Sequence, residues 1–156
     1  MKYIFLSLLI WMIVPKAIAD HHQAAANKGG KPFVLIARLH SLPGKEDQVI
    51  KLSRSADEAV ESTEPGMLLH TFDQDPNDSL GFVWTEVYAN SAALIFHLQN
   101  PPLQQYLADV SPLLDSFTVE LYGEVSPEAV ELLVATGTPT THYKTKLGYI
   151  RDFNRF

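Results

Sequence analysis

A histidine at position 97 stands in a pattern that can support proton transfer. His97 follows Leu94 by three positions and directly precedes Leu98, so it borders the apolar stripe of a short helix. Its imidazole titrates near neutral pH, which suits a general base. In this setting a histidine is more often a core residue whose hydrogen bonds are satisfied. His97 is therefore a candidate base that competes with a purely structural interpretation.

Aromatic residues and one carboxylate accompany this histidine in the sequence. Trp84 and Tyr88 lie on a strand-like segment, and Phe96 and Tyr106 lie on the helical segments that follow. Such residues build cores more often than ligand pockets. Glu86 stands in the middle of the same apolar strand, where a buried carboxylate would need a partner.

The periodicity of the apolar residues predicts the elements that would position these side chains. Short apolar runs rich in Val and Ile predict strands, and an apolar stripe at helical spacing predicts an amphipathic helix over 46–61. Ser91 is expected to cap the helix that carries His97. The remaining predicted elements are strands at 33–39, 67–73, 82–88 and 117–122 and helices at 92–99 and 103–110.

The order strand, helix, strand, strand, helix, strand is that of the split βαβ, or ferredoxin-like, arrangement. It predicts an α+β fold in which an antiparallel sheet carries its helices on one face. The other face of the sheet would remain bare. A second copy of the chain is the natural cover, so we expect a homodimer.

The first nineteen residues have the pattern of a secretory signal peptide. Lys2 precedes an apolar run over 3–14, and Ala17 and Ala19 supply the small residues before a cleavage site. A membrane helix needs roughly 20 apolar residues, so we expect no membrane anchor after cleavage. The sequence thus predicts a signal peptide at 1–19, a polar linker at 20–31 and a periplasmic or secreted protein.

Cleavage there would leave Asp20-His21-His22 at the free amino terminus. A histidine third from a free amine can complete a square-planar nitrogen site for Cu(II) or Ni(II). His21 and His22 are therefore candidate metal ligands, and a solvated linker with two histidines is the alternative.

The composition excludes several classes of function. The 156 residues suffice for one domain, and 12 Lys and Arg against 18 Asp and Glu give a net charge of −6, which disfavours nucleic-acid binding. Cysteine is absent, so disulfides, thiolate metal sites and thiol nucleophiles are excluded. The Asp73-x-Asp75-x-Asn77 segment resembles the start of a calcium loop but lacks its glycine, and a hairpin turn is expected instead.

The C-terminal residues 125–156 form a separate unit. Ser126-Pro127 is typical of a helix start, and Gly137 is typical of its end. Residues 142–156 carry four basic residues and one acid, in contrast to the acidic body of the chain. This basic tail is expected to fold back on its own subunit or on a partner subunit, or to form an edge strand whose Lys144 and Lys146 point to water.

The combination of these motifs resembles the antibiotic biosynthesis monooxygenase family. The segment 82–98 has the family's strand with Glu86 and an aromatic residue, its Ser91 turn, and its helix with His97. The resemblance covers roughly 32–124, which we take as the domain, and implies a dimeric α+β barrel. The other matching motifs are Pro43-Gly44-Lys45, Glu64-Pro65-Gly66, Phe72-x-x-Asp75-Pro76, Asn100-Pro101 and Tyr106.

The resemblance narrows the expected chemistry. Haem-degrading members carry Asn, Trp and His at positions that correspond to Ala37, His97 and Leu107 here, so haem degradation is not expected. The pattern is more similar to quinol-oxidising and signal-processing members. A cofactor-independent monooxygenase that uses O2 on a small aromatic, quinol-like molecule is the leading hypothesis.

This hypothesis assigns a role to each candidate residue. His97 would act as the base, and Tyr88 and Tyr106 would orient the substrate hydroxyl or stabilise an oxyanion. Residues expected to contact the substrate are Trp84, Glu86, Phe96 and Ala37. The alternatives are a binding module that holds a hydrophobic ligand without turnover, an enzyme that processes a small signal molecule, and a structural interaction protein.

Overall fold

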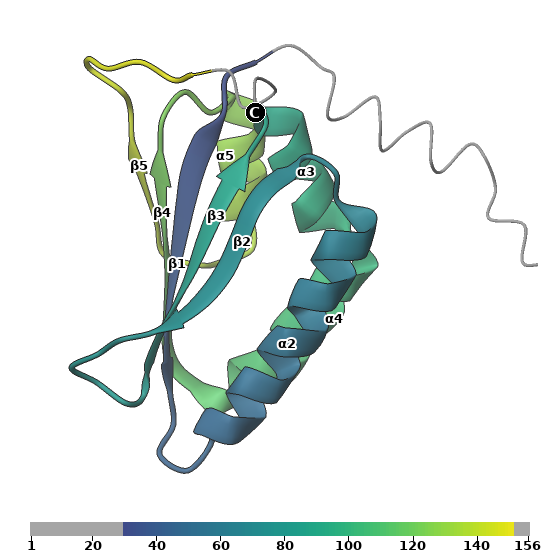
Figure 1. Cartoon of the computed structure of the whole chain (residues 1–156), viewed down its shortest axis with the longest axis vertical. Helices are drawn as coiled ribbons and strands as arrows, with labels where there is room; N and C mark the ends of the chain where they lie inside the picture. Colours follow the sequence, from purple (N-terminus) through teal and green to yellow (C-terminus); the bar gives the residue numbers. More distant parts are fainter. Residues whose placement is uncertain (1–29, 152–156) are drawn as a thin grey trace, which may run out of the picture.

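The computed structural model describes residues 30–151, in which a sheet carries all of its helices on one face (Figure 1). The predicted signal peptide, His21 and His22 lie outside the described residues. They stay predictions, which mass spectrometry of the chain's start and a copper titration can test. The strands are β1 Phe33–Ser41, β2 Met67–Gln74, β3 Gly81–Tyr88, β4 Leu114–Tyr122 and β5 Thr140–Tyr143, and the helices are α2 Glu46–Thr63, α3 Ser91–Gln99, α4 Pro101–Val110, η1 Ser111–Leu113 and α5 Pro127–Val134.

The sheet has the strand order β2-β3-β1-β4-β5. The pairs β2–β3, β3–β1 and β1–β4 are antiparallel, which confirms the predicted ferredoxin-like arrangement. At the centre of the sheet, Ala37 of β1 lies between Trp84 of β3 and Val119 of β4. These central strands therefore place side chains from distant parts of the sequence under the same helices.

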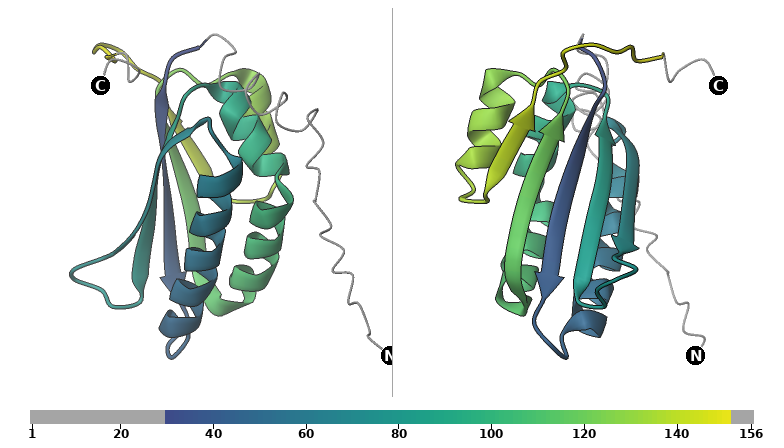
Figure 2. Two further views of the ribbon diagram at one scale, coloured as in Figure 1. Left: turned by 45° about the vertical axis from the view of Figure 1, so that its right-hand side comes forward. Right: turned by 90° about the vertical axis from the view of Figure 1, so that its left-hand side faces the viewer.

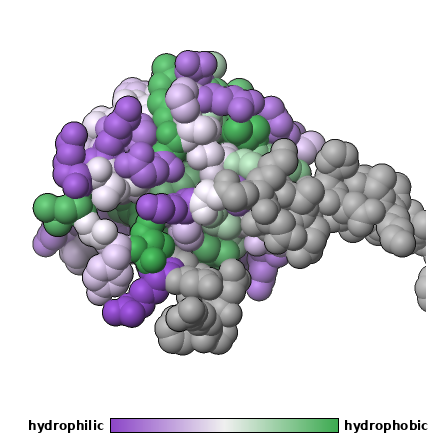
Figure 3. All heavy atoms as spheres, turned by 90° about the horizontal axis from the view of Figure 1, so that it is seen from above, coloured by the Kyte–Doolittle hydropathy of each residue, from purple (hydrophilic) through white to green (hydrophobic). Residues whose placement is uncertain are grey.

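The fifth strand pairs with β4 in parallel, a feature that the sequence did not predict. Helix α5 reverses the chain between β4 and β5, as a crossover between parallel strands requires. β5 also begins at Thr140, ahead of the predicted basic tail. Lys144 and Lys146 follow the strand and are exposed. Figure 3 views this end of the molecule, where polar residues (purple) surround separate apolar ones (green).

Two details of the helices differ from expectation. Asn90, rather than Ser91, caps α3, because the Asn90 side chain accepts a hydrogen bond from the Ala93 amide at 3.1 Å. Ser91 instead accepts from the Ser126 amide at 2.9 Å and so ties α3 to the start of α5. In α2 the buried positions include the polar Ser53, whose hydroxyl lies 3.0 Å from the hydroxyl of Tyr106.

Within residues 30–151 no element covers the second face of the sheet, as the two views in Figure 2 show. Leu68 and Leu69 of β2 are each 41% exposed, and the rings of Tyr122 and Tyr143 stack with centroids 4.8 Å apart. None of the helices in the described part of the chain has the length and apolar character that crossing a bilayer requires.

A glycine at position 66 brings the start of β2 close to α3. Its carbonyl accepts a hydrogen bond from the Ala89 amide at 2.9 Å. A β-carbon on Gly66 would lie 2.6 Å from the β-carbon of Ala93, closer than two such atoms can approach. The residue must therefore be small, because this contact fixes the height of α3 above the turn that contains Glu64.

We predict that Gly66→Ala lowers the free energy of unfolding by about 1–3 kcal/mol, since the added methyl group overpacks the contact with Ala93. Urea denaturation measures the effect. Ala93→Gly in the Gly66→Ala background removes the clash, and we expect it to restore part of the loss despite the cost of a helical glycine of about 1 kcal/mol. Additive destabilisation by the two substitutions would contradict this explanation.

Candidate functional site

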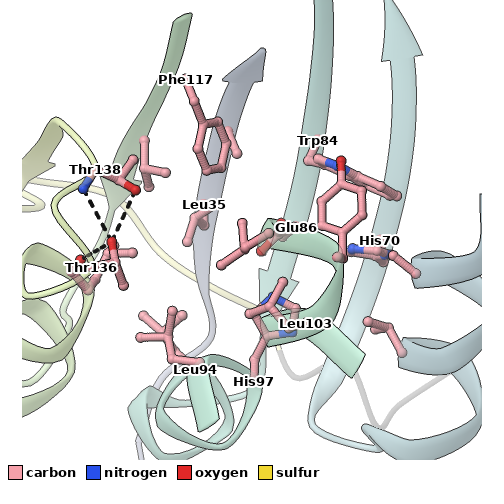
Figure 4. A pocket seen from close by; sticks show the side chains of 18 residues that line it. Leu35, His70, Trp84, Glu86, Leu94, His97, Leu103, Phe117, Thr136 and Thr138 are labelled. Atoms are coloured by element: carbon pink, nitrogen blue, oxygen red, sulfur yellow. Dashed lines mark hydrogen bonds between the residues drawn. The ribbon is translucent and has the colours of Figure 1, made fainter. Parts of the chain in front are cut away.

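A cavity of about 60 Å³ lies between the sheet and the helices (Figure 4). Its ionisable lining groups are His70, Glu86, His97 and Tyr106, which come from β2, β3, α3 and α4. The rest of the lining is almost entirely apolar. Those residues are Leu35, Ala37, Ala56, Val60, Trp84, Leu94, Leu98, Leu103, Leu107, Phe117, Val119 and Leu133, with Thr136 and Thr138 at one end.

His97 is held by a carboxylate from the end of α2. Its Nδ1 lies 2.8 Å from Oε2 of Glu64, and both side chains are buried. The Asn100 amide donates to Oε1 of Glu64 at 2.8 Å and to the Thr63 hydroxyl at 3.1 Å. Because Nδ1–H donates to the carboxylate, Nε2 of the neutral imidazole is the nitrogen that can accept a proton from a ligand.

The surroundings of His97 also set its protonation. Burial lowers the pKa of His97, because it disfavours the charged imidazolium. The hydrogen bond to Glu64 and the charges of Glu86 and Glu64 act in the opposite direction and prevail, so the pKa of His97 is raised above its usual value of 6.5. His97 is therefore neutral, and able to accept a proton, only at a pH above that raised pKa.

Glu86 points from β3 into the cavity and is 5% exposed. Its Oε2 accepts a hydrogen bond from the Tyr88 hydroxyl at 2.5 Å. Burial and the neighbouring Glu86 charge raise the pKa of Tyr88 well above 10, so this phenol keeps its proton. Tyr88 does not line the cavity, and its role in the structure is to hold Glu86.

Tyr106 closes the cavity from α4. Its hydroxyl accepts a hydrogen bond from Nε1 of Trp84 at 3.2 Å and lies 3.0 Å from the Ser53 hydroxyl. Burial raises the pKa of Tyr106 above 10, although the hydrogen bonds with Ser53 and Trp84 reduce the effect. The hydroxyl thus stays protonated near neutral pH and can donate either to Ser53 or to a ligand.

A second histidine reaches the cavity from β2. The ring of His70 stacks on Trp84 with centroids 4.1 Å apart, and its centroid lies 6.4 Å from that of His97. Nδ1 of His70 lies 2.8 Å from Oδ1 of Asp57, whose side chain is 49% exposed. The Asp57–His70 pair therefore connects the cavity with solvent, whereas the Glu64–His97 pair is enclosed.

The structure brings most of the predicted site residues together. Ala37, Trp84, Glu86, His97 and Tyr106 line the cavity, and Tyr88 supports Glu86 from behind. Phe96 lies on α3 but does not line the cavity, so we leave it out of the candidate site. Residues 30–151 contain no group of three or more His, Asp or Glu side chains arranged to hold a metal ion.

Sequence reasoning missed Glu64, His70 and Asp57 as site residues. Glu64 was visible only as part of a Glu-Pro-Gly motif at a helix end. The two-residue alternation of β2 was the available signal for His70, since it places His70 and Phe72 on the same face as Trp84. Nothing in the local sequence pairs Asp57 with His70.

The comparison with known families gives a match that spans half of the chain. The model of the family described as antibiotic biosynthesis monooxygenase matches residues 32–109. An uncharacterized protein of Synechocystis, sll1783, is 31% identical over 83 residues, which are 53% of this chain. That match spans only 56% of the Synechocystis protein.

Solved structures share the fold. A Nitrosomonas europaea protein assigned to the antibiotic biosynthesis monooxygenases is similar with a TM-score of 0.58 and 20% identity, over 64% of this chain and 96% of that one. The protein PA3566 from Pseudomonas aeruginosa is similar with a TM-score of 0.55 and 24% identity, over 59% and 92% of the two chains. At these identities the likeness concerns the fold alone.

We predict that Glu64→Ala lowers the free energy of unfolding by about 3–5 kcal/mol, because it removes one member of a buried pair and leaves His97 and Asn100 without their acceptor. Glu64→Gln keeps an acceptor oxygen and should cost less. Urea denaturation measures both. Glu61→Ala, at an exposed position of the same helix, is the control, and an equal loss for Glu61→Ala and Glu64→Ala would contradict the prediction.

Proposed function

This chain belongs to the antibiotic biosynthesis monooxygenase family, and on that premise we propose that it is a cofactor-independent monooxygenase for a small hydroxylated aromatic molecule such as a quinol. One observation carries the proposal. An otherwise apolar cavity contains an oriented histidine, His97, beside the Glu86 carboxylate and the Tyr106 hydroxyl. Apolar cavities with a few convergent polar groups are typical of small-molecule sites.

The proposed reaction needs no electrons beyond those of the substrate. A hydroquinone reacts with O2 to give a hydroxyquinone and water: one oxygen atom forms a bond to a ring carbon, the O–O bond breaks, and the other oxygen leaves as water. The ring carbons are oxidised and O2 is reduced. The protein would contribute by binding the ring, removing a proton and excluding bulk water.

The geometry assigns the proton transfer to His97. Its Nε2 would accept the proton of the substrate hydroxyl, and Glu64 would stabilise the imidazolium that forms. The resulting electron-rich quinolate is the species that reduces O2. Tyr106 would donate a hydrogen bond to the developing oxyanion, since its hydroxyl keeps its proton.

A binding module without turnover is the second candidate. The observation that favours it is that each ionisable group of the cavity already has a partner in the protein: His97 has Glu64, Glu86 has Tyr88, His70 has Asp57 and Tyr106 has Ser53. Such a network could hold a ligand with no group free to react. It predicts saturable binding of a hydroquinone and no product.

We predict that oxygen uptake with a hydroquinone, measured as kcat/KM, rises with pH through an apparent pKa above 6.5. Below that pKa His97 is protonated and cannot accept the substrate proton. Glu64→Gln removes a charge and a charged hydrogen bond that raise the pKa of His97, so the rise should move to lower pH. His97→Ala should lower kcat/KM by about 10²–10⁴-fold.

His40→Ala is the matched control, because His40 pairs with Asp115 and Asp78 and does not line the cavity. Unchanged activity in His97→Ala would remove the proposed base. Binding of the hydroquinone by the native protein with no oxygen uptake would favour the binding module.

We also propose that a second copy of the chain covers the bare face of the sheet. Val87, near the end of β3, lies on that face between Val34 of β1 and Leu69 of β2. Stable interfaces bury about 800 Å² per partner, which one face of a sheet can supply.

We predict that the native protein is a dimer at micromolar concentration and that Val87→Glu weakens the dimer at least about 100-fold, because it places an unpaired carboxylate among apolar neighbours. Analytical ultracentrifugation measures the dissociation constant. Lys51→Glu, on the exposed side of α2, should leave it unchanged. A monomeric native protein would contradict the proposal.

A further inference from the structure

The cavity runs across the strands of the sheet. Its lining includes His70 of β2, Glu86 of β3, Leu35 of β1 and Val119 of β4, which follow the strand order. Neighbouring strands lie about 4.8 Å apart, so the distance from β2 to β4 is roughly 14 Å. A volume of about 60 Å³ over this length describes a narrow passage, so a ring that carries a chain enters only when the half-buried side chains of the lining move apart.

The polarity of this passage changes along its length. The ionisable groups gather at the β2–β3 end, where Figure 4 shows His70, Glu86 and His97 close together. Beyond them, the side chains that line the passage under β1 and β4 are apolar. This middle section is formed by Leu35, Leu94, Val119 and Leu133, all of which are buried.

The passage also reaches solvent at its far end, opposite the Asp57–His70 pair, and we call this second opening its mouth. There the lining residues regain exposure: Phe117 and Thr138 are half-buried, and Thr136 is exposed. Leu103 and Leu107 of α4 are also half-buried. These lining residues are more exposed than those of the buried middle section. A ligand that fills the passage would therefore reach water here, between α4 and the α5–β5 connection.

The α5–β5 connection that borders this mouth is internally braced. The Thr136 hydroxyl donates to the Leu133 carbonyl at 2.7 Å and accepts from the Thr138 amide at 3.3 Å. Leu133, Thr136 and Thr138 all follow the segment 32–109 that matches the family. The end of the cavity that they build thus lies outside the segment that the family model matches.

We propose that the ligand of this cavity is a hydroxylated aromatic ring that carries one unbranched apolar chain. The placement of the ring beside His97 and Glu86 rests on the proposed function. The chain lies along the apolar middle section and leaves between α4 and Thr138. A narrow apolar passage that ends at two threonine hydroxyls accepts methylene groups along its length and a water-facing terminus at its mouth, and it has no space for a bulky branched tail.

Anaerobic titration calorimetry with hydroquinone and its 2-ethyl, 2-butyl and 2-hexyl derivatives tests the proposal. We expect the dissociation constant to fall about fourfold for each added methylene group, because each leaves water for an apolar lining. Thr138→Phe narrows the mouth and should weaken binding of the hexyl compound about tenfold while leaving hydroquinone unchanged. Thr145→Phe is the control, since Thr145 is exposed after β5 and does not line the cavity.

The outcomes separate the two proposals. If hydroquinone binds but chain length and Thr138→Phe have no effect, the chain passage is overturned and the proposed function stands. If hexanol binds as well as hexylhydroquinone with the same dependence on length, the passage stands and the proposed ring site fails. A melting temperature for Thr138→Phe equal to that of Thr145→Phe would show that narrowing, rather than misfolding, causes the loss.

Discussion

The site depends on one buried interaction, the pair between Glu64 and His97. Removing two such groups from water is costly, and their mutual attraction offsets that cost only when the geometry is good and the remaining lone pairs are satisfied. Asn100 supplies the second hydrogen bond to the carboxylate. The end of α2, the last turn of α3 and the start of α4 must therefore meet at one point, and the close contact at Gly66 permits this.

The other polar groups in the core meet the same requirement, which is that a buried polar group must have hydrogen-bond partners. Glu86 is tolerated on a buried strand because Tyr88 donates to it, and Tyr106 is tolerated because Trp84 and Ser53 surround its hydroxyl. Within residues 30–151 the hydroxyl of Ser41 is the only buried side-chain polar atom that lacks a partner. A satisfied network of this kind keeps polar groups rigid in an apolar cavity, which is what binding a polar ring requires.

Much of this arrangement followed from local patterns. The alternation of β3 predicted that Phe82, Trp84, Glu86 and Tyr88 share a face, and all four are buried. The chain order of elements predicted the sheet. What escaped prediction was long-range pairing: Glu64 and His97 are separated by 33 residues, and periodicity specifies which face a residue takes, not which residue it meets. The parallel pairing of β5 with β4 was not predicted for a related reason. The direction in which the chain returns after α5 depends on how that helix packs on the sheet, and local periodicity does not specify it.

The short fifth strand leaves part of the sheet open. β5 pairs with Val119–Tyr122, so in the described part of the chain the first half of the longer β4 has no neighbour on that side. Unpaired strand edges tend to recruit strands from other molecules and so promote aggregation. Here the open half contains Asp115, Ser116 and Thr118, which are exposed and polar. The charge of Asp115 and the hydration of the two hydroxyl groups therefore disfavour such recruitment at the open half of β4.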